Sequence, residues 1–393
     1  MRFLCFSFLS PPATDAESAC VGRFLSALVA VGNDVKLISL DHRSAKDHLS
    51  DDIANELLDS RISVLRLPLR HVSLAMRIFS KIKHGLFSAC TEYIDDAVEL
   101  VRQDLIAHPG TILITRCAWP ASNIVGWKCR RYAKMWVPHF SDPFPSYKKM
   151  IWREYWRYPF AYLWLVRILR DSSFVTVTCH NAVRYFDEIT SGRYHDKLNV
   201  IYHIGAPRLR SSGYILPRHG DEKIIVHVGA LLAGRPVGHF AAVASQFTGV
   251  RFIQFGKVYD EKLKGLIESY DIESPRMSTD AMSNADAILV CDLDSGFGYT
   301  PYLPSKFAYA LVLGKPLICL TTPDSEMARI AKTVSGIYCL DMLRSDYKEI
   351  NHLLKQFVSG CLVCPAAAET NIVAPTSVCE SFMSVVRSIG PHG

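Results

Sequence analysis

The sequence lacks any run of eighteen apolar residues, although 49% of its 393 residues are hydrophobic. A membrane-spanning helix needs about 20 predominantly apolar residues, so none is expected. The apolar start, Met1–Ser10, could be mistaken for a signal peptide, but its apolar core spans only residues 3–9 and Pro11 and Pro12 follow at once. We interpret this segment as a first buried strand.

The chain has little excess of charge of either sign. Its net charge is +6, and 21% of its residues are charged. This mild excess suits anionic substrates or a membrane surface, and it is too small and too spread out to indicate nucleic-acid binding. Together with the high apolar content, it indicates a folded globular protein and excludes a disordered one.

Disulfide and metal patterns are also missing. Several of the twelve cysteines fall inside predicted strands or helices, where a free cysteine behaves as a small apolar residue. These are Cys5, Cys20, Cys179, Cys291 and Cys319. A reducing cytoplasm is therefore the expected location. Cys361 and Cys364 form the single Cys-x-x-Cys, without a second pair or a histidine at ligand spacing, so no metal site is expected.

Two catalytic signatures are absent. Gly-x-Ser-x-Gly, the nucleophile elbow of many serine hydrolases, does not occur. No Gly-x-Gly-x-x-Gly follows the first predicted strand, where dinucleotide-binding dehydrogenases have it. Neither of these enzyme classes is indicated.

What is present is an alternation of strand and helix patterns, clearest between residues 285 and 320. The apolar run Ala285–Cys291 leads into a glycine-containing loop, then into a helix pattern that starts near Ser305 and ends at Gly314, and then into the apolar run Leu317–Leu320. Continuous apolar runs are typical of strands covered on both faces. This is a βαβ unit, and its loop lies at the carboxyl end of a parallel sheet, where open α/β sheets place ligands.

The same alternation covers most of the chain, which is long enough for two Rossmann-like domains. Further helices are predicted at about 72–88, 91–107 and 377–389. Strands are predicted at 1–10, 34–40, 61–67, 111–115, 135–137, 173–179, 198–202, 223–228, 252–255 and 336–340.

Pro304-Ser305-Lys306, followed after a short amphipathic helix by Gly314-Lys315-Pro316, resembles a known family. These motifs resemble the retaining nucleotide-sugar glycosyltransferases of the GT-B fold, in particular glycosyltransferase family 4, in its bacterial members that build surface polysaccharides. The resemblance implies an α/β fold with two Rossmann-like domains facing a cleft. It also implies a metal-independent enzyme without a cofactor, for which the nucleotide sugar is the substrate.

Domain boundaries follow from this resemblance and from composition. An acceptor-side domain is predicted at 1–206, and a linker with proline, glycine, serine and arginine at 207–222. The nucleotide-sugar-binding domain is predicted at 223–374. The terminal helix, within 375–393, is expected to pack back on the first domain, as in GT-B proteins.

The donor site is predicted in the second domain. A diphosphate needs backbone N–H donors and fixed cations, and after strand 223–228 the glycines allow close backbone approach while Arg235 supplies a forked cation. Lys306 is a second candidate cation, with a solvated charge as the alternative. The predicted donor-binding residues are Gly229, Gly234, Arg235, Asp294, Gly296, Phe297, Gly298, Ser305 and Lys306.

The acceptor side is predicted in the first domain. Thr14, Asp15 and Glu17 stand where many family members have a Gly-Gly pair. Asp142, or His139 beside it, is predicted to orient the acceptor hydroxyl, and the alternative for His139 is a core or turn residue.

One departure from the family pattern concerns two glutamates separated by seven residues, the first near the reacting sugar and the second on the ribose hydroxyls. Counted back from Gly314, these positions hold Pro301 and Tyr309. Asp292 and Asp294 lie on the same loop and could substitute for them or cap turns. Asp292-Leu293-Asp294 has the form of an Asp-x-Asp metal motif, which this family does not use.

Residues 147–170 combine aromatic rings with cations. The sequence Trp152-Arg-Glu-Tyr-Trp-Arg157 is typical of the segment. Such a segment can lie in a bilayer interface, with its rings at headgroup level and its cations toward anionic lipid. The alternative is that the rings pack into the domain core and the cations form its solvated face.

The leading interpretation is a retaining glycosyltransferase at the cytoplasmic face of a membrane, with a nucleotide-sugar donor and a polysaccharide or lipid-linked oligosaccharide acceptor. Two alternatives remain. One is a degenerate GT-B protein that acts as a binding or partner subunit, and the other is a nucleotide-sugar 2-epimerase. No nucleic-acid partner is expected.

Overall fold

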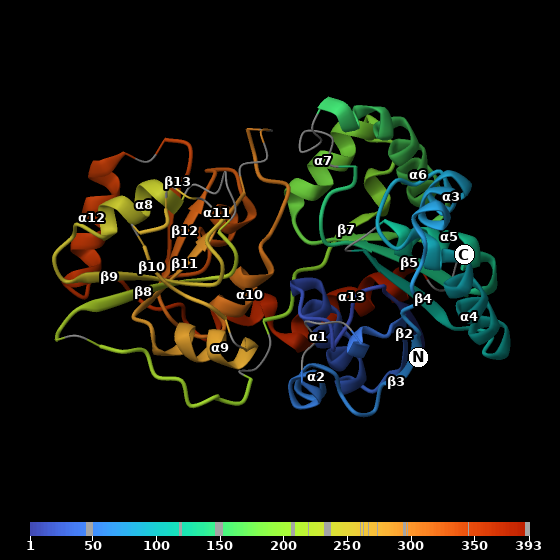
Figure 1. Cartoon of the computed structure of the whole chain (residues 1–393), viewed down its shortest axis with the longest axis horizontal. Helices are drawn as coiled ribbons and strands as arrows, with labels where there is room; N and C mark the ends of the chain where they lie inside the picture. Colours follow the sequence, from blue (N-terminus) through green and yellow to red (C-terminus); the bar gives the residue numbers. More distant parts are fainter. Residues whose placement is uncertain are drawn as a thin grey trace. The chain divides into compact units, whose positions relative to one another are not determined.

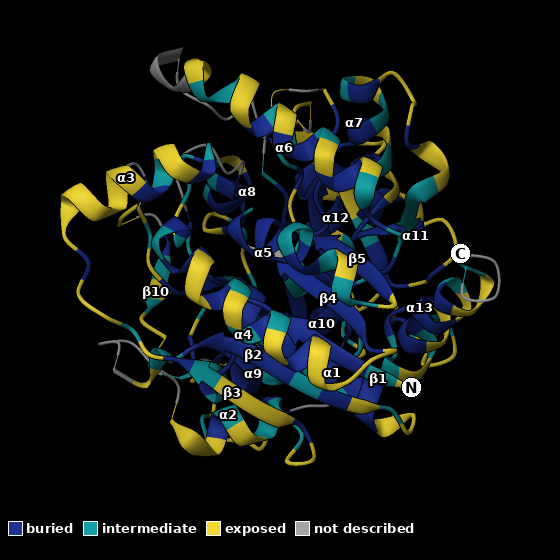
Figure 2. Cartoon of the chain, turned by 90° about the vertical axis from the view of Figure 1, so that its right-hand side faces the viewer, coloured by how far each residue is buried: buried dark blue, intermediate teal, exposed yellow. Residues whose placement is uncertain are grey.

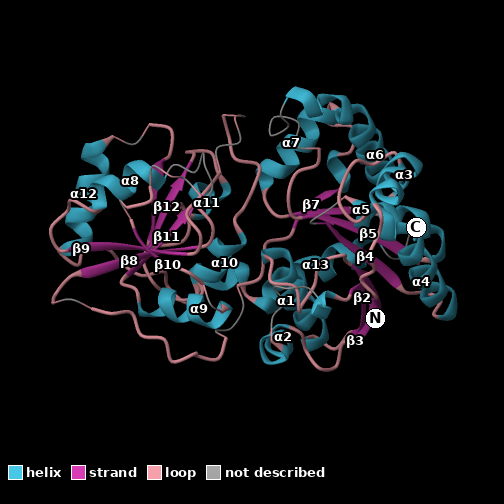
Figure 3. Cartoon of the chain, viewed as in Figure 1, coloured by secondary structure: helices cyan, strands magenta, loops and turns pink. Residues whose placement is uncertain are grey.

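The computed structural model describes residues 1–44, 50–117, 120–145, 152–205, 209–218, 220–231, 237–259, 261, 263–265, 267–272, 274–293, 296, 298–344 and 346–389. The chain forms two compact units (Figure 1), which we call the first and second domains. The first comprises residues 1–203 and 375–393, and the second comprises residues 204–374. Each domain contains one parallel sheet with helices on both sides (Figure 3).

The first domain alternates strands and helices along the chain. Its strands are β1 (Arg2–Phe6), β2 (Asp34–Leu40), β3 (Ser63–Leu67), β4 (Ile112–Cys117), β5 (Met135–Phe140), β6 (Val175–Val177) and β7 (Leu198–Val200). Its helices are α1 (Ala16–Ala30), α2 (Asp51–Leu57), α3 (Leu74–His84), α4 (Ile94–Ala107), α5 (Ala121–Cys129), α6 (Tyr158–Asp171), α7 (His180–Thr190) and α13 (Pro375–Ile389), with a 3-10 helix, η5 (Trp152–Arg157), before α6.

The seven strands have the order β3-β2-β1-β4-β5-β6-β7. All pairs are parallel, and Phe3 of β1 lies between Val35 of β2 and Ile112 of β4. The central strands are buried on both faces, which explains their continuous apolar sequences. The predicted strand 1–10 is therefore confirmed as the central strand β1, although it is shorter than predicted.

The C-terminal helix α13 belongs to the first domain, beside α1 (Figure 1). Its Phe382 is 1% exposed and contacts the rings of Phe3, Phe24 and Phe174, with centroid distances of 6.1, 5.2 and 6.1 Å. Burying one such ring stabilises the fold by about 1.5–3 kcal/mol. The helix is thereby fixed to the sheet although the whole second domain, residues 204–374, precedes it.

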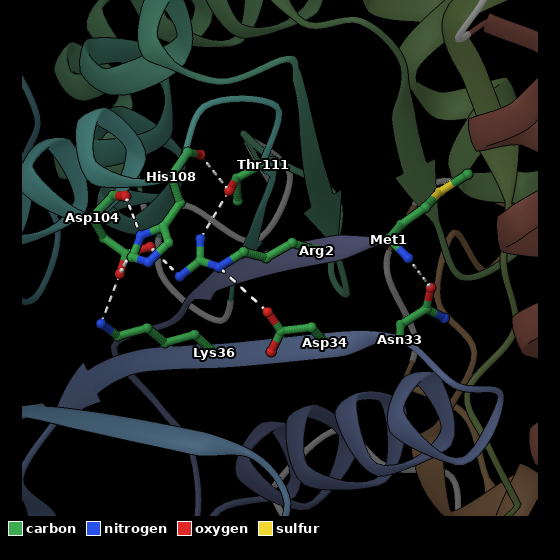
Figure 4. Close-up of polar contacts among 8 residues, drawn as sticks. All are labelled: Met1, Arg2, Asn33, Asp34, Lys36, Asp104, His108 and Thr111. Carbon is green, nitrogen blue, oxygen red and sulfur yellow. Dashed lines mark hydrogen bonds and ion pairs between the residues drawn. The ribbon is translucent and has the colours of Figure 1, made fainter.

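A buried carboxylate joins the amino ends of β1 and β2 to α4 (Figure 4). The Asp104 side chain is 4% exposed and accepts hydrogen bonds from Arg2 at 2.9 Å and from Lys36 at 2.7 Å. Burial raises the pKa of Asp104, but the bonds from Lys36 and Arg2 outweigh it and leave the pKa below its usual value. The two cations offset the free-energy cost of burying this carboxylate inside the domain.

We expect Asp104→Asn to lower the free energy of unfolding by about 2 kcal/mol at pH 7, because it removes charge-assisted hydrogen bonds. The folded-state pKa is lowered, so the contribution is present above the unfolded-state pKa of about 3.9 and is lost as pH falls through the folded-state value. Urea unfolding at pH 7 and at pH 3 measures this. Asp196→Asn, at an exposed site, is the control, and an equal loss at both pH values would contradict the prediction.

The second domain is also built on parallel strands. They are β8 (Lys223–Val228), β9 (Val250–Phe255), β10 (Glu268–Tyr270), β11 (Ala287–Cys291), β12 (Leu317–Thr321) and β13 (Ile337–Asp341), in the order β10-β9-β8-β11-β12-β13. The helices are α8 (Val237–Ala244), α9 (Pro275–Asn284), α10 (Ser305–Leu311), α11 (Glu326–Ile330) and α12 (Tyr347–Val358). Because the chain turns to β9 on one side of β8 and to β11 on the other, the carboxyl ends of β8 and β11 flank a topological switch point.

The βαβ unit at 285–320 is confirmed as β11, α10 and β12. Phe307 and Leu311 on α10 are fully buried, and Gly314 ends the segment with a φ of 64° that favours glycine. The predicted linker 207–222 differs from the structure, because its described residues belong to the second domain. Ser211, Ser212 and Tyr214 bind the buried Asp280 carboxylate there, and Leu216 is 2% exposed.

In the parts of the chain that the structure describes, no helix is both long enough and apolar enough to span a bilayer. The cysteines whose side chains the structure describes, which exclude Cys117, are free thiols.

Candidate functional site

A row of polar side chains crosses the first sheet near its carboxyl edge. Arg116 of β4 is paired in register with His139 of β5, and His139 is paired with Thr176 of β6. In-register residues of parallel strands point to the same face, so the three side chains lie side by side. His139 Nδ1 and Thr176 Oγ1 form a hydrogen bond of 3.0 Å. All three residues are buried.

Glu17 of α1 completes this cluster. It is 8% exposed, and its carboxylate accepts hydrogen bonds from Arg116 Nε at 3.2 Å and from Ser141 Oγ at 2.5 Å. Burial raises the pKa of Glu17, while Arg116 and Ser141 act in the opposite direction. Glu17 therefore contacts the cation beside His139, and it was predicted on the acceptor side without this partner.

Burial, followed by the charge of Arg116, lowers the pKa of His139 well below its usual value. The ring is therefore neutral at pH 7. Its Nε2 atom is buried and has no hydrogen-bond partner among the described residues. A neutral ring with one nitrogen bonded to Thr176 can offer the other nitrogen to a ligand hydroxyl, which is a positioning role.

The other residues predicted for the acceptor side have different environments. Asp15 is the N-cap of α1 and accepts a hydrogen bond from Ser18 N at 2.9 Å, so it has a structural role in the helix start. Thr14 and Asp142 are exposed near the carboxyl ends of β1 and β5. Asp142 also raises the pKa of Glu17, as a minor contribution after burial, so its charge acts on the cluster.

We expect the stability of the wild-type protein to fall as pH drops below about 6.5, because the unfolded His139 then binds a proton that the folded ring does not. The slope from this one group is at most about 1.4 kcal/mol per pH unit. His139→Gln should flatten the curve of unfolding free energy between pH 6.5 and 5. His352→Gln, at an exposed position, is the control, and unchanged curves for both variants would contradict a buried neutral His139.

In the second domain, Lys306 lies against the turn that follows β8. Gly229 has a φ of 114°, which favours glycine, and the Lys306 ammonium occupies the space that a side chain at Gly229 would fill. The predicted donor residues Gly229 and Lys306, 77 positions apart, are thus brought together at the carboxyl end of β8. A cation beside an open backbone is suited to phosphate oxygens.

The Gly229 turn is held in place by a buried polar pair that was not predicted from the sequence. His227 and Gln254 are paired in register on β8 and β9, and His227 Nδ1 donates to Gln254 Oε1 at 2.6 Å. Gln254 Nε2 in turn donates to the carbonyl oxygen of Gly229. Gly256 permits this arrangement, because a side chain there would lie 2.7 Å from the same oxygen. The only sequence signal was a polar residue inside each apolar strand.

Three more of the predicted donor residues lie in the loop after β11 and at the start of α10. Gly296 and Gly298 are exposed, with φ values of 66° and 78°, and Ser305 begins α10 directly before Lys306. Asp292, considered as a substitute for a family glutamate, is 1% exposed and accepts a hydrogen bond from Thr321. Its place is in the interior, where it links β11 to β12.

Gly234, Arg235, Asp294 and Phe297 lie outside the described residues, so their donor roles stay predictions. At the two positions that lack glutamate, Pro301 is buried and Tyr309 is 5% exposed. The Tyr309 hydroxyl lies 2.8 Å from Thr279 Oγ1. The described residues contain no group of three or more histidine, cysteine, aspartate or glutamate side chains that could hold a metal.

A cavity of about 440 Å³ lies at the carboxyl ends of β9 and β10, next to Gly256. Its lining includes Lys257, Tyr259, Lys264 and Tyr270. The Tyr259 ring is 56% exposed, and aromatic rings with nearby cations are suited to a planar base and its phosphates. The sequence did not indicate this cavity, because β10 has only three residues and no clear strand pattern.

No protein-family model matches this sequence, and no curated protein matches it. Solved structures are similar to it over nearly the full length. The catalytic domain of starch synthase IV from Arabidopsis thaliana, bound to ADP and acarbose, has a TM-score of 0.66 at 9% identity, with 99% of each chain covered. The lipopolysaccharide outer core galactosyltransferase WaaB, in its apo form, has a TM-score of 0.60 at 11% identity, again with 99% of each chain covered.

A protein from Listeria monocytogenes that is assigned as a UDP-N-acetylglucosamine 2-epimerase is also similar. Its TM-score is 0.58 at 10% identity, with 100% of this chain and 98% of that chain covered. At such identities the likeness concerns the fold alone. The two parallel-sheet domains and the full-length matches show that this chain has the GT-B fold that its sequence predicted.

Proposed function

We propose that the chain is a retaining glycosyltransferase of the family 4 type, which moves a sugar from a nucleotide-sugar donor to a polysaccharide or lipid-linked oligosaccharide acceptor. The observation that carries the proposal is the contact of the Lys306 ammonium with Gly229 at the topological switch point of the second domain. A cation there can neutralise the donor diphosphate as the bond to the sugar breaks. Arg235, in the same loop, would be the second cation.

The cavity beside Gly256 supports the same proposal. It adjoins the Gly229 turn through the close approach of Gly256 to the Gly229 carbonyl oxygen. A nucleotide would place its base against Tyr259 and its diphosphate toward Lys306. The sugar would then lie near the exposed backbone of Gly296 and Gly298.

The chemistry proposed needs few side chains. In a front-face mechanism the acceptor oxygen attacks the anomeric carbon from the side of the leaving diphosphate, and a phosphate oxygen takes the acceptor proton. The protein supplies position and charge stabilisation. In the first domain, His139 and Asp142 would orient the acceptor hydroxyl, with Glu17 and Arg116 holding the ring environment of His139. No metal is part of this mechanism.

Two alternatives have their own support. The missing glutamates, with Tyr309 buried against Thr279, favour a protein that binds sugar nucleotides without turnover. The similarity to the Listeria protein favours a nucleotide-sugar 2-epimerase. Incubation with nucleotide sugars, followed by mass spectrometry and sugar analysis, separates transfer, epimerisation and no reaction.

We expect one nucleotide family in a panel of ADP, GDP, UDP and their sugar conjugates to stabilise the protein. A ligand at about 100 times its dissociation constant adds roughly 2.7 kcal/mol of stability. Thermal unfolding of the intact chain with each compound measures this. A folded sample that responds to none of them would contradict nucleotide binding and with it both enzyme proposals.

Lys306→Met and Arg235→Ala should each weaken binding of the stabilising nucleotide about tenfold or more, because each removes a charge-assisted contact worth roughly 1.5–3 kcal/mol. Lys348→Met, at an exposed site on α12, is the control and should bind normally. Gly229→Ala and Gly314→Ala form a second matched pair, since both residues have positive φ but only Gly229 contacts Lys306. Titration calorimetry measures the nucleotide affinity of all these variants. Within the glycine pair, weaker binding is expected for Gly229→Ala and not for Gly314→Ala. Unchanged affinity in Lys306→Met would show that Lys306 does not bind the donor.

A further inference from the structure

Helix α3 in the first domain exposes its apolar side. Leu74, Ile78, Phe79 and Ile82 are 73%, 50%, 58% and 65% exposed. At about 100° per residue, the spacing from Leu74 to Ile78 to Ile82 places these side chains on one stripe, with Phe79 at its edge. A helix that packs on a domain normally turns such a stripe toward the core, so α3 has the reverse orientation.

The side of α3 that faces the protein is polar. Ser80 and His84 are its two buried residues, and their spacing of four places them on the side opposite the apolar stripe. The carbonyl oxygen of His84 accepts a hydrogen bond of 2.9 Å from Trp164 Nε1 on α6. The orientation of α3 is therefore fixed by contacts at the end of the helix. The helix is packed on the domain, and its apolar stripe is nevertheless exposed.

A second exposed apolar group adjoins this helix. Phe87, which follows the Gly85 cap of α3, contacts the rings of Trp156 and Phe160 with centroid distances of 4.5 and 5.6 Å. Trp156, Phe160 and Leu163 are 51%, 42% and 52% exposed, and their spacing of four and three residues places them on one side. We call the exposed residues Leu74, Ile78, Phe79, Ile82, Trp156, Phe160 and Leu163 the α3–α6 surface. Helices α3 and α6 both carry exposed positions in Figure 2.

The charged residues of the segment that carries α3 are all cations. Residues 61–90 contain six arginines and lysines and no aspartate or glutamate. Arg77 and Lys81 follow one edge of the stripe and Lys83 the other, by the same helical spacing. Lys83 pairs with Asp95 at 2.6 Å and Arg77 approaches Glu92 at 3.9 Å, yet both cations stay about half exposed.

We propose that the α3–α6 surface docks the protein on an anionic lipid bilayer, with the stripe of α3 inserted among the acyl chains and Arg77, Lys81 and Lys83 at headgroup level. An apolar stripe bordered by cations and joined by aromatic rings matches the layers of a bilayer interface. Protein partners of standard size bury apolar centres with few lysines around them, which fits this surface less well. The inference does not depend on the transferase proposal, since lipid binding is measured without donor or acceptor.

The sequence placed its membrane-contact prediction at 147–170, of which residues 147–151 lie outside the described part. In the rest of that range some rings are buried and others are exposed. Trp164 is buried against Trp127, whereas Trp156, Phe160 and Leu163 are exposed. Helix α3 was predicted as a helix but not as a membrane contact, because its apolar stripe has the same sequence pattern as that of a packed helix.

The test is flotation of the intact protein with vesicles of phosphatidylcholine alone and with vesicles that contain about one-third phosphatidylglycerol. The wild type should float with the anionic vesicles, less at high salt, and only weakly with the neutral ones. Phe79→Ser with Ile82→Ser should reduce the partition coefficient about tenfold or more, because the removed groups insert into lipid. Arg77→Gln with Lys81→Gln should abolish the preference for anionic vesicles.

The matched control is Ile215→Ser with Leu343→Ser, which removes two exposed apolar side chains of the second domain and should leave flotation unchanged. Circular dichroism and thermal unfolding show that each variant is folded, as expected for exposed positions. Flotation of the Phe79 and Ile82 variant at the wild-type level, or no flotation of the wild type, would overturn the proposal. A wild-type dimer that this variant converts to a monomer, without vesicle binding, would assign the surface to a second copy of the chain.

Discussion

The constraint on which this molecule depends is the covering of both faces of a parallel sheet by helices. Backbone groups inside the sheets pair with neighbouring strands, and the side chains between sheet and helices are almost all apolar. Charged and ligand-facing polar groups are more easily accommodated where strands end. Both candidate sites, around His139 and around Gly229, lie at carboxyl ends for this reason, and the Asp104 cluster lies at amino ends.

These buried polar groups differ in what they contribute. Asp104 has two cations as partners, and its lowered pKa shows a net gain from the folded environment. In the cluster of Glu17, Arg116 and His139, burial raises the pKa of Glu17 and lowers that of His139, so both side chains resist their charged forms. A fold gains little stability from such a cluster. Its position at the carboxyl edge of the sheet is consistent with the acceptor-side role that we propose for it.

The two surfaces proposed for ligands follow different physical logic. The Gly229 turn is a backbone site whose shape is fixed by His227, Gln254 and Gly256. The α3–α6 surface is apolar and exposed, and α3 is held in place by the bond from Trp164 to His84 and by the ion pairs of Arg77 and Lys83. The Gly229 turn is suited to a small anion. The α3–α6 surface is suited to a lipid bilayer, whose acyl chains can pack around the exposed side chains.

Much of the architecture could be predicted from the sequence. Predominantly apolar segments at 223–228, 285–291 and 317–320 predicted buried parallel strands, because strands covered on both faces have such sequences. Gly314 and Pro316 predicted the end of α10. The donor turn was predicted at Gly229, and Lys306 was proposed as its cation. The contact between these two residues could not be derived from the sequence, because they are 77 positions apart and the order of the strands in the sheet brings them together.

What the sequence by itself determined is therefore the alternation of elements, the two-domain fold and the places where strands meet loops, because these follow from local periodicity and turn chemistry. The tertiary structure alone decided which polar residues become neighbours and which apolar stripe faces water. His227 with Gln254, Arg116 with Glu17 and the cavity beside Tyr259 all arise from strand order and register. Helix α3 is the clearest example, since its periodicity is the same whether the apolar stripe faces a core or a bilayer. Its contacts with the rest of the first domain, including the hydrogen bond from Trp164 to His84, leave the stripe exposed.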